Sequence, residues 1–175
     1  MQTDWAEILR NAENARRFFP LFVDIRGKDV LVIGGGRIAL RRVLSLLQFG
    51  CRIHIIAEKL CGGLLEIVES LAGNGGIFVE LREFRSGDCV ALGGGQTQPF
   101  FVVAATNDSK VNHAAAVECR EHNIPVSVAD SKTASTFFFP ALVIRDPIVA
   151  GITSSGKDHS AVRKTAAKIR KVIKP

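Results

Sequence analysis

The sequence predicts an α/β fold, a doubly wound parallel sheet followed by a small β segment and a C-terminal helix. Three observations support this prediction. Short apolar runs alternate with stretches of helical periodicity as far as residue 130. The first apolar run ends in three consecutive glycines. After Asp130 the pattern changes to two β-type runs and one amphipathic stretch rich in lysine and arginine.

The apolar runs bounded by turn residues predict five strands, at residues 29–33, 52–57, 77–84, 100–105 and 125–129. Between them, apolar side chains at helical spacing predict helices at residues 38–49, 60–72 and 111–122. The first helix is expected to stop at Gly50, and the second at the glycine-rich stretch 73–76. Residues 93–99 are expected to form a loop. Strands that alternate with helices pair in parallel.

The last part of the chain predicts different structure. Residues 136–143 and 148–153 are β-type runs separated by Arg145-Asp146-Pro147, which indicates a hairpin outside the main sheet. A polar loop, 154–159, precedes a helix from Ser160 whose apolar stripe is Val162, Ala166, Ile169, Val172 and Ile173. Residues 1–17 show amphipathic helical spacing and lack the continuous apolar stretch of a signal peptide.

The composition points to a globular protein of one domain with a small appendage. The chain has 175 residues, of which 47% are hydrophobic, so it can form a packed core. No apolar run is long enough to cross a bilayer, and we expect a cytoplasmic protein with no membrane partner. The cysteines form no C-x-x-C pair and have no histidine at ligand spacing, which predicts reduced, buried thiols and no metal site: Cys51, Cys61, Cys89 and Cys119.

The net charge of +6 comes from the end of the chain. Residues 1–156 contain 16 basic and 16 acidic side chains, whereas residues 157–175 contain seven basic side chains against Asp158 alone. Such a segment is either a solvated helix face or a surface for an anionic partner. Nucleic acid is not expected, because the chain has no second helix-turn-helix unit and no aromatic RNA-binding motif.

The segment from Gly34 to Ala39 fits the pattern G-x-G-x-x-G/A, in the required place between a buried strand and a helix. Gly34 permits the tight turn, Gly36 lets the backbone approach a pyrophosphate, and Ala39 lets the helix pack close to the strand. The N-terminus of the helix offers free N–H groups to the phosphates. The alternative is a plain glycine turn. The pattern predicts a Rossmann-type domain that binds a dinucleotide.

Four further positions are candidates for the same site. Glu58 follows the second strand, where a carboxylate accepts hydrogen bonds from the adenosine ribose and disfavours a 2′-phosphate, so NAD is expected rather than NADP. Thr106 and Asn107 follow the fourth strand at the edge where ligands bind, and Asn107 could also cap the next helix. Asp130 follows the last strand of the sheet, where its carboxylate could take a proton from a substrate or simply cap a turn.

The sequence also excludes some enzymes. The chain contains no tyrosine, so a dehydrogenase of the short-chain type with a Tyr–Lys pair is impossible. Only 45 residues follow Asp130, too few for a separate substrate domain of typical size. We expect a second copy of the chain to complete the active site.

An ordered set of segments resembles the precorrin-2 dehydrogenases, which form the N-terminal region of sirohaem synthases. The resemblance covers residues 19–174, and the matching segments are 19–28 running into 30–36, 39–42, 104–108, 128–130, 136–141 and 152–156. It implies NAD-dependent oxidation of precorrin-2 to sirohydrochlorin by a homodimer that exchanges β-structure through the segment after the Rossmann domain. Some members of the family also insert iron, which the sequence leaves open.

The resemblance also implies roles for individual residues. It places Asp130 in the chemistry, and Arg37, Ile38, Glu58 and Lys59 at the cofactor. It divides the chain into an N-terminal extension (1–18), an NAD-binding Rossmann domain (19–130), a dimerisation β segment (131–155) and the start of a basic helical region (156–175). Precorrin-2 carries several carboxylates, which suits a basic helix.

Some positions depart from the family. The first 17 residues and the stretch 93–99 look additional. Ser127 stands where the family often has Asn, and Asp158-His159 where it often has Ser-Pro. The helical region of the family usually continues beyond Pro175. Two alternatives therefore stay open. One is an NAD-sensing regulator whose basic segment touches nucleic acid, and the other is a relative that binds a tetrapyrrole or a partner enzyme without turnover.

Overall fold

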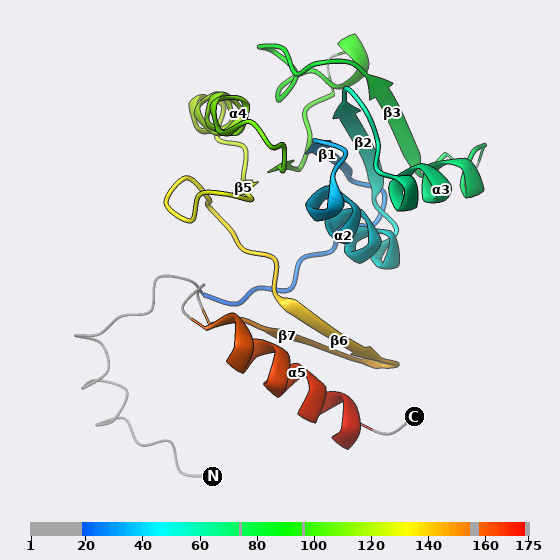
Figure 1. The fold of residues 1–175 in the computed structure, drawn as a ribbon, viewed down its shortest axis with the longest axis vertical. Coiled ribbons are helices and arrows are strands. Elements are labelled where there is room, and N and C mark those ends of the chain that lie inside the picture. Colours follow the sequence, from blue (N-terminus) through cyan, green and yellow to red (C-terminus); the bar gives the residue numbers. More distant parts are fainter. Residues whose placement is uncertain (1–18, 74, 96, 155–157, 174–175) are drawn as a thin grey trace.

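The computed structural model describes residues 19–73, 75–95, 97–154 and 158–173 (Figure 1). The helix expected over residues 1–17 lies outside this part of the chain.

Five parallel strands form the central sheet, in the order β3-β2-β1-β4-β5. Their bounds are β1 Asp29–Ile33, β2 Arg52–Ala57, β3 Ile77–Leu81, β4 Phe101–Ala104 and β5 Val126–Val128. The strand order reverses between β1 and β4, so the predicted doubly wound, Rossmann-type sheet is confirmed. Ile33 pairs with Ile56 on one side and with Ala104 on the other, so these strands end at nearly the same level.

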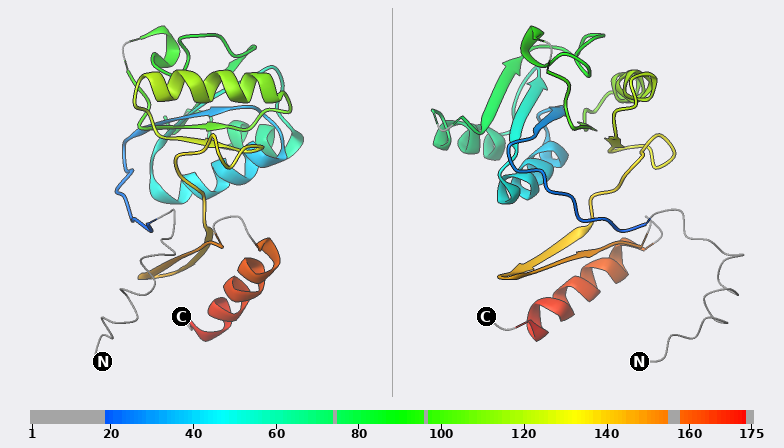
Figure 2. Two further views of the ribbon diagram at one scale, coloured as in Figure 1. Left: turned by 90° about the vertical axis from the view of Figure 1, so that its left-hand side faces the viewer. Right: turned by 180° about the vertical axis from the view of Figure 1, so that it is seen from behind.

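Helices cover both faces of the sheet (Figures 1 and 2). On one face lie α2 (Arg37–Leu46) and α3 (Gly62–Ser70), whose side chains Ala39, Val43 and Leu64 are fully buried. On the other face lies α4 (Ser109–Glu121), which buries Ala115, Ala116 and Cys119. A 3-10 turn, Leu47–Phe49, continues α2 to Gly50 at φ 67°, so the predicted stop at this glycine is confirmed.

The connection between β3 and β4 differs from the prediction. The strand predicted to reach residue 84 ends at Leu81, because the Arg82 guanidinium turns to the Asp88 carboxylate, with both N–O distances 2.7 Å. The described part of residues 82–100 contains only a short 3-10 turn, Leu92–Gly94, in place of a crossover helix. This segment packs beside α4, where the buried Glu118 carboxylate accepts hydrogen bonds from the backbone N–H groups of Gly87 and Cys89.

The predicted hairpin is confirmed, with β6 (Ala141–Arg145) antiparallel to β7 (Ile148–Ile152). The expectation that its first strand begins at residue 136 is wrong. Residues 136–140 are not a strand, because Phe137 and Phe139 pack on the Rossmann core instead, each against Phe101 at ring-centroid distances of 5.0 and 6.3 Å. The Arg42 guanidinium stacks over the Phe139 ring at 4.4 Å. The Rossmann domain therefore contacts two of the three consecutive aromatics of this segment.

Two hydroxyl groups occupy the outer edge of β5. Thr136 Oγ1 accepts a hydrogen bond from the N–H of Val126 at 2.8 Å, and Ser135 Oγ accepts one from the N–H of Val128 at 2.9 Å. The N–H of Thr136 donates in turn to the carbonyl of Val126 at 2.8 Å. Ser135 is 3% exposed, so its bond to Val128 is shielded from solvent. The chain thus fastens itself to the sheet edge before it continues to the hairpin.

Below the Rossmann domain, α5 (His159–Val172) packs against β6 and β7 (Figures 1 and 2). Its buried side chain is Ala166, in the middle of the predicted apolar stripe, whereas Val172 at the end of the stripe is 79% exposed. Asp158 caps the helix by accepting a hydrogen bond from the N–H of Ala161 at 2.8 Å. None of the helices in the described part of the chain has the length and apolar character needed to span a bilayer.

Candidate active site

The carboxyl edge of the sheet gathers the sequence-predicted site residues. Gly34 follows β1, Glu58 follows β2, Thr106 comes two residues after β4 and Asp130 two residues after β5. Parallel strands that end level bring the segments that follow them to one edge, and the strand order reverses here between β1 and β4. Open α/β sheets bind ligands at this point.

Gly34 makes the turn that the sequence predicts. Its φ of +115° lies in the region that favours glycine, and a Cβ would lie 2.4 Å from the Ala105 carbonyl oxygen. Its N–H donates to the carbonyl of Ile56 at 2.8 Å, which ties the turn to β2. The chain therefore leaves β1 sharply and enters α2.

Gly36 stands at the N-cap of α2 and is open. A Cβ there would meet no atom within 4 Å, and no side chain caps the helix. The first turn of α2 contains no acidic residue, so its free N–H groups face no competing carboxylate of their own helix. This is the geometry of a helix N-terminus that can receive an anion.

Gly35 is required for packing, which the sequence analysis missed. A Cβ at this position would lie 2.0 Å from the Lys59 carbonyl oxygen. The N–H of Cys61 donates to the carbonyl of Gly35 at 2.8 Å. The glycine turn and the loop after β2 are thus in direct backbone contact. The available signal was a glycine between Gly34 and Gly36, at a position where the dinucleotide pattern tolerates any residue.

The side chains expected at the cofactor lie open at this edge. Arg37, Ile38, Glu58 and Lys59 are all exposed. Ile38 is 45% exposed although it is apolar and adjoins the fully buried Ala39. The close packing of the helix on the sheet, which the alanine was expected to permit, is present.

Thr106 and Asp130 are joined by a residue that the sequence analysis did not single out. Asn112, on α4, is 1% exposed. Its Oδ1 accepts hydrogen bonds from the Thr106 N–H at 3.0 Å and from the Thr106 hydroxyl at 2.8 Å. Its Nδ2 donates to the Thr106 carbonyl at 3.1 Å and to Asp130 Oδ1 at 3.1 Å. The sequence feature that could have identified Asn112 is a polar residue on the helix face that also carries Ala115, Ala116 and Cys119.

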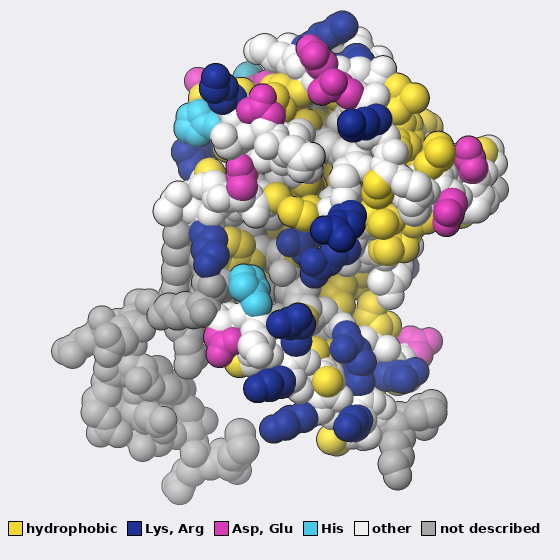
Figure 3. Space-filling view, viewed as in Figure 1, with side chains coloured by type: hydrophobic (Ala, Val, Ile, Leu, Met, Phe, Trp, Pro, Cys, Tyr) yellow, Lys and Arg dark blue, Asp and Glu magenta, His cyan; other side chains and the backbone are white. Residues whose placement is uncertain are grey.

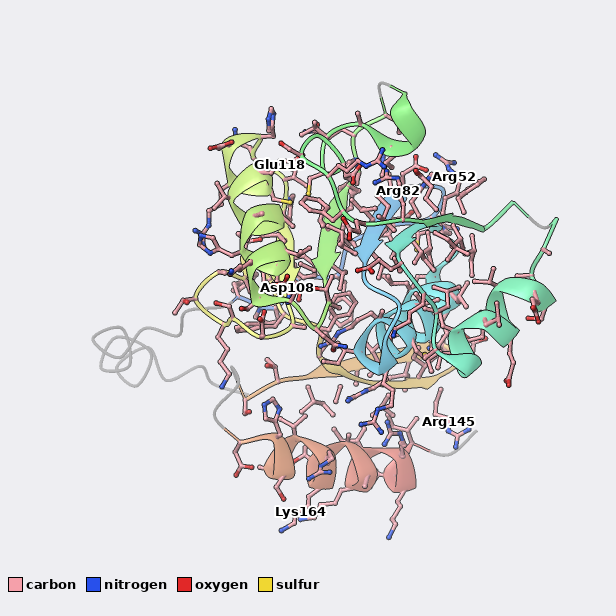
Figure 4. The ribbon with its side chains drawn as sticks, turned by 45° about the horizontal axis from the view of Figure 1, so that its top comes forward. Arg52, Arg82, Asp108, Glu118, Arg145 and Lys164 are labelled. Carbon is pink, nitrogen blue, oxygen red and sulfur yellow. The ribbon has the colours of Figure 1, made fainter. Side chains whose placement is uncertain are left out.

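Asp108, and not Asn107, caps α4, since its carboxylate accepts a hydrogen bond from the N–H of Lys110 at 2.8 Å. Asn107 is exposed. Figure 4 labels Asp108 at the start of α4 and Glu118 towards its far end, so the helix begins at the site edge and runs away from it.

The strongest ion pairs lie away from the glycine turn. At the amino end of the sheet, Arg52 Nε donates to Asp29 Oδ1 at 2.8 Å, and this contact lowers the pKa of Asp29 despite its partial burial. Asp88 likewise raises the pKa of Arg82. A polar hollow lined by Lys28, Asp29 and Arg52 also opens at this amino end. Ligands of doubly wound sheets bind at the opposite edge, so Asp29 and Arg52 have a structural role here.

The part of the chain that the structure describes contains all four cysteines. Cys51, Cys89 and Cys119 are buried and Cys61 is partly exposed, all as free thiols. Contact with Cys119 and burial raise the pKa of Cys89, so its thiol stays protonated. Within residues 19–73, 75–95, 97–154 and 158–173, no group of three His, Cys, Asp or Glu side chains could hold a metal ion.

Basic side chains gather over α5 in the space-filling view (Figure 3). Arg163, Lys164, Lys168 and Lys171 are exposed. Arg170 instead donates to the carbonyl of Leu142 on β6 at 3.0 Å, which fastens the helix to the hairpin. The exposed bases give this end of the molecule a positive surface.

Comparisons with known proteins agree with this geometry. The model of a family described as "Putative NAD(P)-binding" matches residues 21–141. The chain is 40% identical over 157 residues to the "Probable multifunctional siroheme biosynthesis protein HemA" of Ruminiclostridium josui, covering 88% of this chain. It is 35% identical over 153 residues to the "Siroheme synthase" of Ectopseudomonas mendocina (strain ymp), covering 87% of this chain. It spans 28% and 30% of the length of these two relatives.

Among solved structures, the chain is similar to "SirC, precorrin-2 dehydrogenase", with a TM-score of 0.70 and 24% sequence identity. The superposition covers 90% of this chain and 72% of that one. At this identity the likeness establishes the fold, including a sheet, hairpin and helix in the same arrangement.

Proposed function

This chain belongs to the NAD(P)-binding family whose model it matches, and we propose that it is an NAD-dependent precorrin-2 dehydrogenase. The reaction would oxidise precorrin-2 to sirohydrochlorin in sirohaem biosynthesis. The names of its relatives agree with the resemblance that the sequence analysis found. The observation that carries the proposal is the carboxylate of Asp130, which lies at the same sheet edge as the glycine turn and is hydrogen-bonded to Asn112.

The residues at the edge fit a dinucleotide. Gly34 and Gly36 leave the N-terminus of α2 open to a pyrophosphate, with Arg37 and Ile38 beside it. Glu58 and Lys59 follow β2, where the adenosine ribose would lie, and Thr106 follows β4 near the reacting end. The carboxylate of Glu58 would repel a 2′-phosphate, so NAD is the cofactor that we propose. When bound, NAD accepts a hydride.

Asp130 would accept the proton that accompanies this oxidation. Dehydrogenation of precorrin-2 removes a hydride and a proton, and the proton needs an acceptor within hydrogen-bonding reach. The Asp130 side chain is exposed at the edge, and one of its carboxylate oxygens is held by Asn112. A carboxylate fixed in this way can take a proton from a substrate placed beside it.

The basic surface of α5 would hold the substrate's carboxylates. The exposed lysines and arginines of this helix project from the part of the molecule that follows the Rossmann domain (Figure 3). Lysine and arginine bind carboxylates through charge-assisted hydrogen bonds. A tetrapyrrole bound in this way would contact both the carboxyl edge of the Rossmann sheet and α5.

We also propose a cytoplasmic homodimer. In the described part of the chain, β6 and β7 pair only with each other, so each has an outer edge that no further strand covers. Edges of this kind pair readily with a strand of another chain.

Anaerobic incubation of the protein with precorrin-2 and NAD tests the function, with the absorbance of sirohydrochlorin as the signal. We expect product with NAD and much less with NADP. Binding of NAD and precorrin-2 without any sirohydrochlorin would refute the enzymatic proposal and favour a tetrapyrrole-binding role without turnover. Addition of Fe²⁺ to the completed reaction tests whether iron insertion follows.

A further inference from the structure

Asn112 is the most completely buried polar side chain in the described part of the chain, and all of its bonds lead to the candidate active site. Its carboxamide contacts the backbone N–H, the carbonyl and the hydroxyl of Thr106, and the carboxylate of Asp130. A buried carboxamide without partners would cost free energy, whereas this one is fully used. The cluster joins two of the residues assigned above to the cofactor and to the proton transfer.

The Thr106 backbone fixes which way the carboxamide points. The Thr106 N–H must meet an acceptor and the Thr106 carbonyl must meet a donor, so Oδ1 faces the first and Nδ2 the second. A flipped amide would set donor against donor and acceptor against acceptor. The second proton of Nδ2 is therefore aimed at Asp130 Oδ1 by the main chain of the segment that follows β4.

Asn112 also links the segments after β4 and β5, beyond the last hydrogen bond between these two strands. The last ladder bond between β4 and β5 runs from the N–H of Ala129 to the carbonyl of Ala104 at 2.9 Å. Beyond it the two strands separate, and Asn112 bridges the gap from Thr106 to Asp130. The backbone N–H of Asn112 bonds to the carbonyl of Asp108 in the first turn of α4, so a rigid helix holds the bridge.

We propose that Asn112 is a positioning residue, which holds the Asp130 carboxylate in the orientation for proton transfer and fixes Thr106 beside it. This inference rests on the function proposed above. A donor aimed at Oδ1 restricts rotation of the carboxylate. Asn112 itself is buried and does not touch the substrate.

Asn112→Asp is the variant that separates positioning from folding. It is isosteric, and one carboxylate oxygen still accepts both hydrogen bonds from Thr106. The other oxygen replaces the donor, so an acceptor faces both the Thr106 carbonyl and Asp130 Oδ1. We expect kcat for precorrin-2 oxidation to fall about 10-fold to 100-fold through misplacement of the base, while the KM for NAD stays within about twofold. Asn123→Asp adds the same charge beyond the far end of α4 and should leave kcat unchanged.

The double variant Asn112→Asp/Asp130→Asn supplies the second readout. It restores a donor–acceptor pair with the roles exchanged, so the Tm should recover in part relative to Asn112→Asp alone. Turnover should stay as slow as in Asp130→Asn alone, because Asn112 acts only through Asp130. Wild-type kcat in Asn112→Asp, with Asp130→Asn slow, would overturn the positioning role and leave the proposed function standing. An equal loss of rate from Asn112→Asp in both backgrounds would also overturn it.

A wild-type protein that does not oxidise precorrin-2, or an Asp130→Asn variant at the wild-type rate, would instead be a failure of the proposed function. The contact itself is then decided by NMR of ¹⁵N-labelled protein. The side-chain amide signals of Asn112 should shift on Asp130→Asn. Unchanged signals would show that Asn112 does not hold Asp130, and the inference would fall independently of any activity.

Discussion

Replacing Gly35 and Gly36 by alanine, one at a time, should separate folding from cofactor binding at the glycine turn. The two glycines are adjacent, and each change adds one methyl group. At Gly35 the new Cβ would lie 2.0 Å from the Lys59 carbonyl oxygen and 3.0 Å from the Leu60 side chain. Carbon and carbonyl oxygen keep about 3.3 Å apart, so the turn and the loop after β2 must separate by roughly 1.3 Å.

The cost for Gly35→Ala follows from this displacement. Overpacking of a tight site costs about 1–3 kcal/mol. The movement also breaks the hydrogen bond from the Cys61 N–H to the Gly35 carbonyl, which adds about 1 kcal/mol. We expect the free energy of unfolding to fall by about 2–4 kcal/mol, a large share of the roughly 5–15 kcal/mol that holds a domain folded.

Gly36→Ala should show the opposite pattern. Its φ of −85° suits alanine, and no atom lies within 4 Å of the new methyl group. The loss of about 0.5 kcal/mol at an N-cap and the gain of about 0.4–1 kcal/mol from a stiffer unfolded chain nearly cancel. The methyl group would stand where the pyrophosphate approaches, and a clash of about 1–3 kcal/mol weakens NAD binding by roughly 5-fold to 150-fold.

Urea unfolding measures the first effect and calorimetric titration with NAD the second, each on both variants. A Gly35→Ala protein as stable as the wild type would refute the packing argument. Unchanged NAD affinity in Gly36→Ala, and equally in the bulkier Gly36→Val, would refute the placement of the pyrophosphate.

Four other outcomes are expected. Asp130→Asn should slow precorrin-2 oxidation about a hundredfold or more while NAD affinity stays nearly intact, as steady-state kinetics and calorimetry will show. Glu58→Gln should narrow the preference for NAD over NADP in the same assay, and an unaltered preference would remove Glu58 from the ribose site. Sedimentation should give a dimer at micromolar concentration, and a monomer would contradict the open-edge argument. Arg52 lowers the pKa of Asp29, so the stability from this carboxylate is present above about pH 4 and is lost as the pH falls through the folded-state pKa. In Asp29→Asn, the free energy of unfolding measured with urea should therefore fall less steeply as the pH is lowered. A decrease as steep as in the wild type would show that Asp29 does not contribute.

The elements that could be predicted from sequence are those whose burial is complete and local. The bounds of β1 and β2 match the prediction, because both strands are apolar runs that end at a glycine or at polar residues. Residues 136–140 were predicted as strand because Phe137, Phe138 and Phe139 have high β-propensity. Their actual conformation depends on the Rossmann face and on Arg42, which periodicity does not reveal.

The candidate site likewise contains features that could be predicted from the sequence and features that could not. The turn at Gly34 could be predicted because strand, glycines and helix are consecutive in the chain. Asn112 could not, because it meets Asp130 across 18 positions, through the pairing of β4 with β5. The requirement for glycine at position 35 is also tertiary, since the clash comes from Lys59 in another loop.

The hydroxyl groups on the outer edge of β5 bear on how this protein avoids aggregation. An open sheet exposes a row of N–H and C=O groups at its edge, and such a row is a template for adding strands from other molecules. Here Thr136 and Ser135 saturate the N–H groups of Val126 and Val128 with side-chain oxygens. A side-chain hydroxyl accepts a hydrogen bond from the backbone N–H but offers no backbone groups for another strand. Addition of strands therefore stops at β5. The chain can therefore leave the outer edges of the hairpin for pairing while the β5 edge of its main sheet stays closed to further strands.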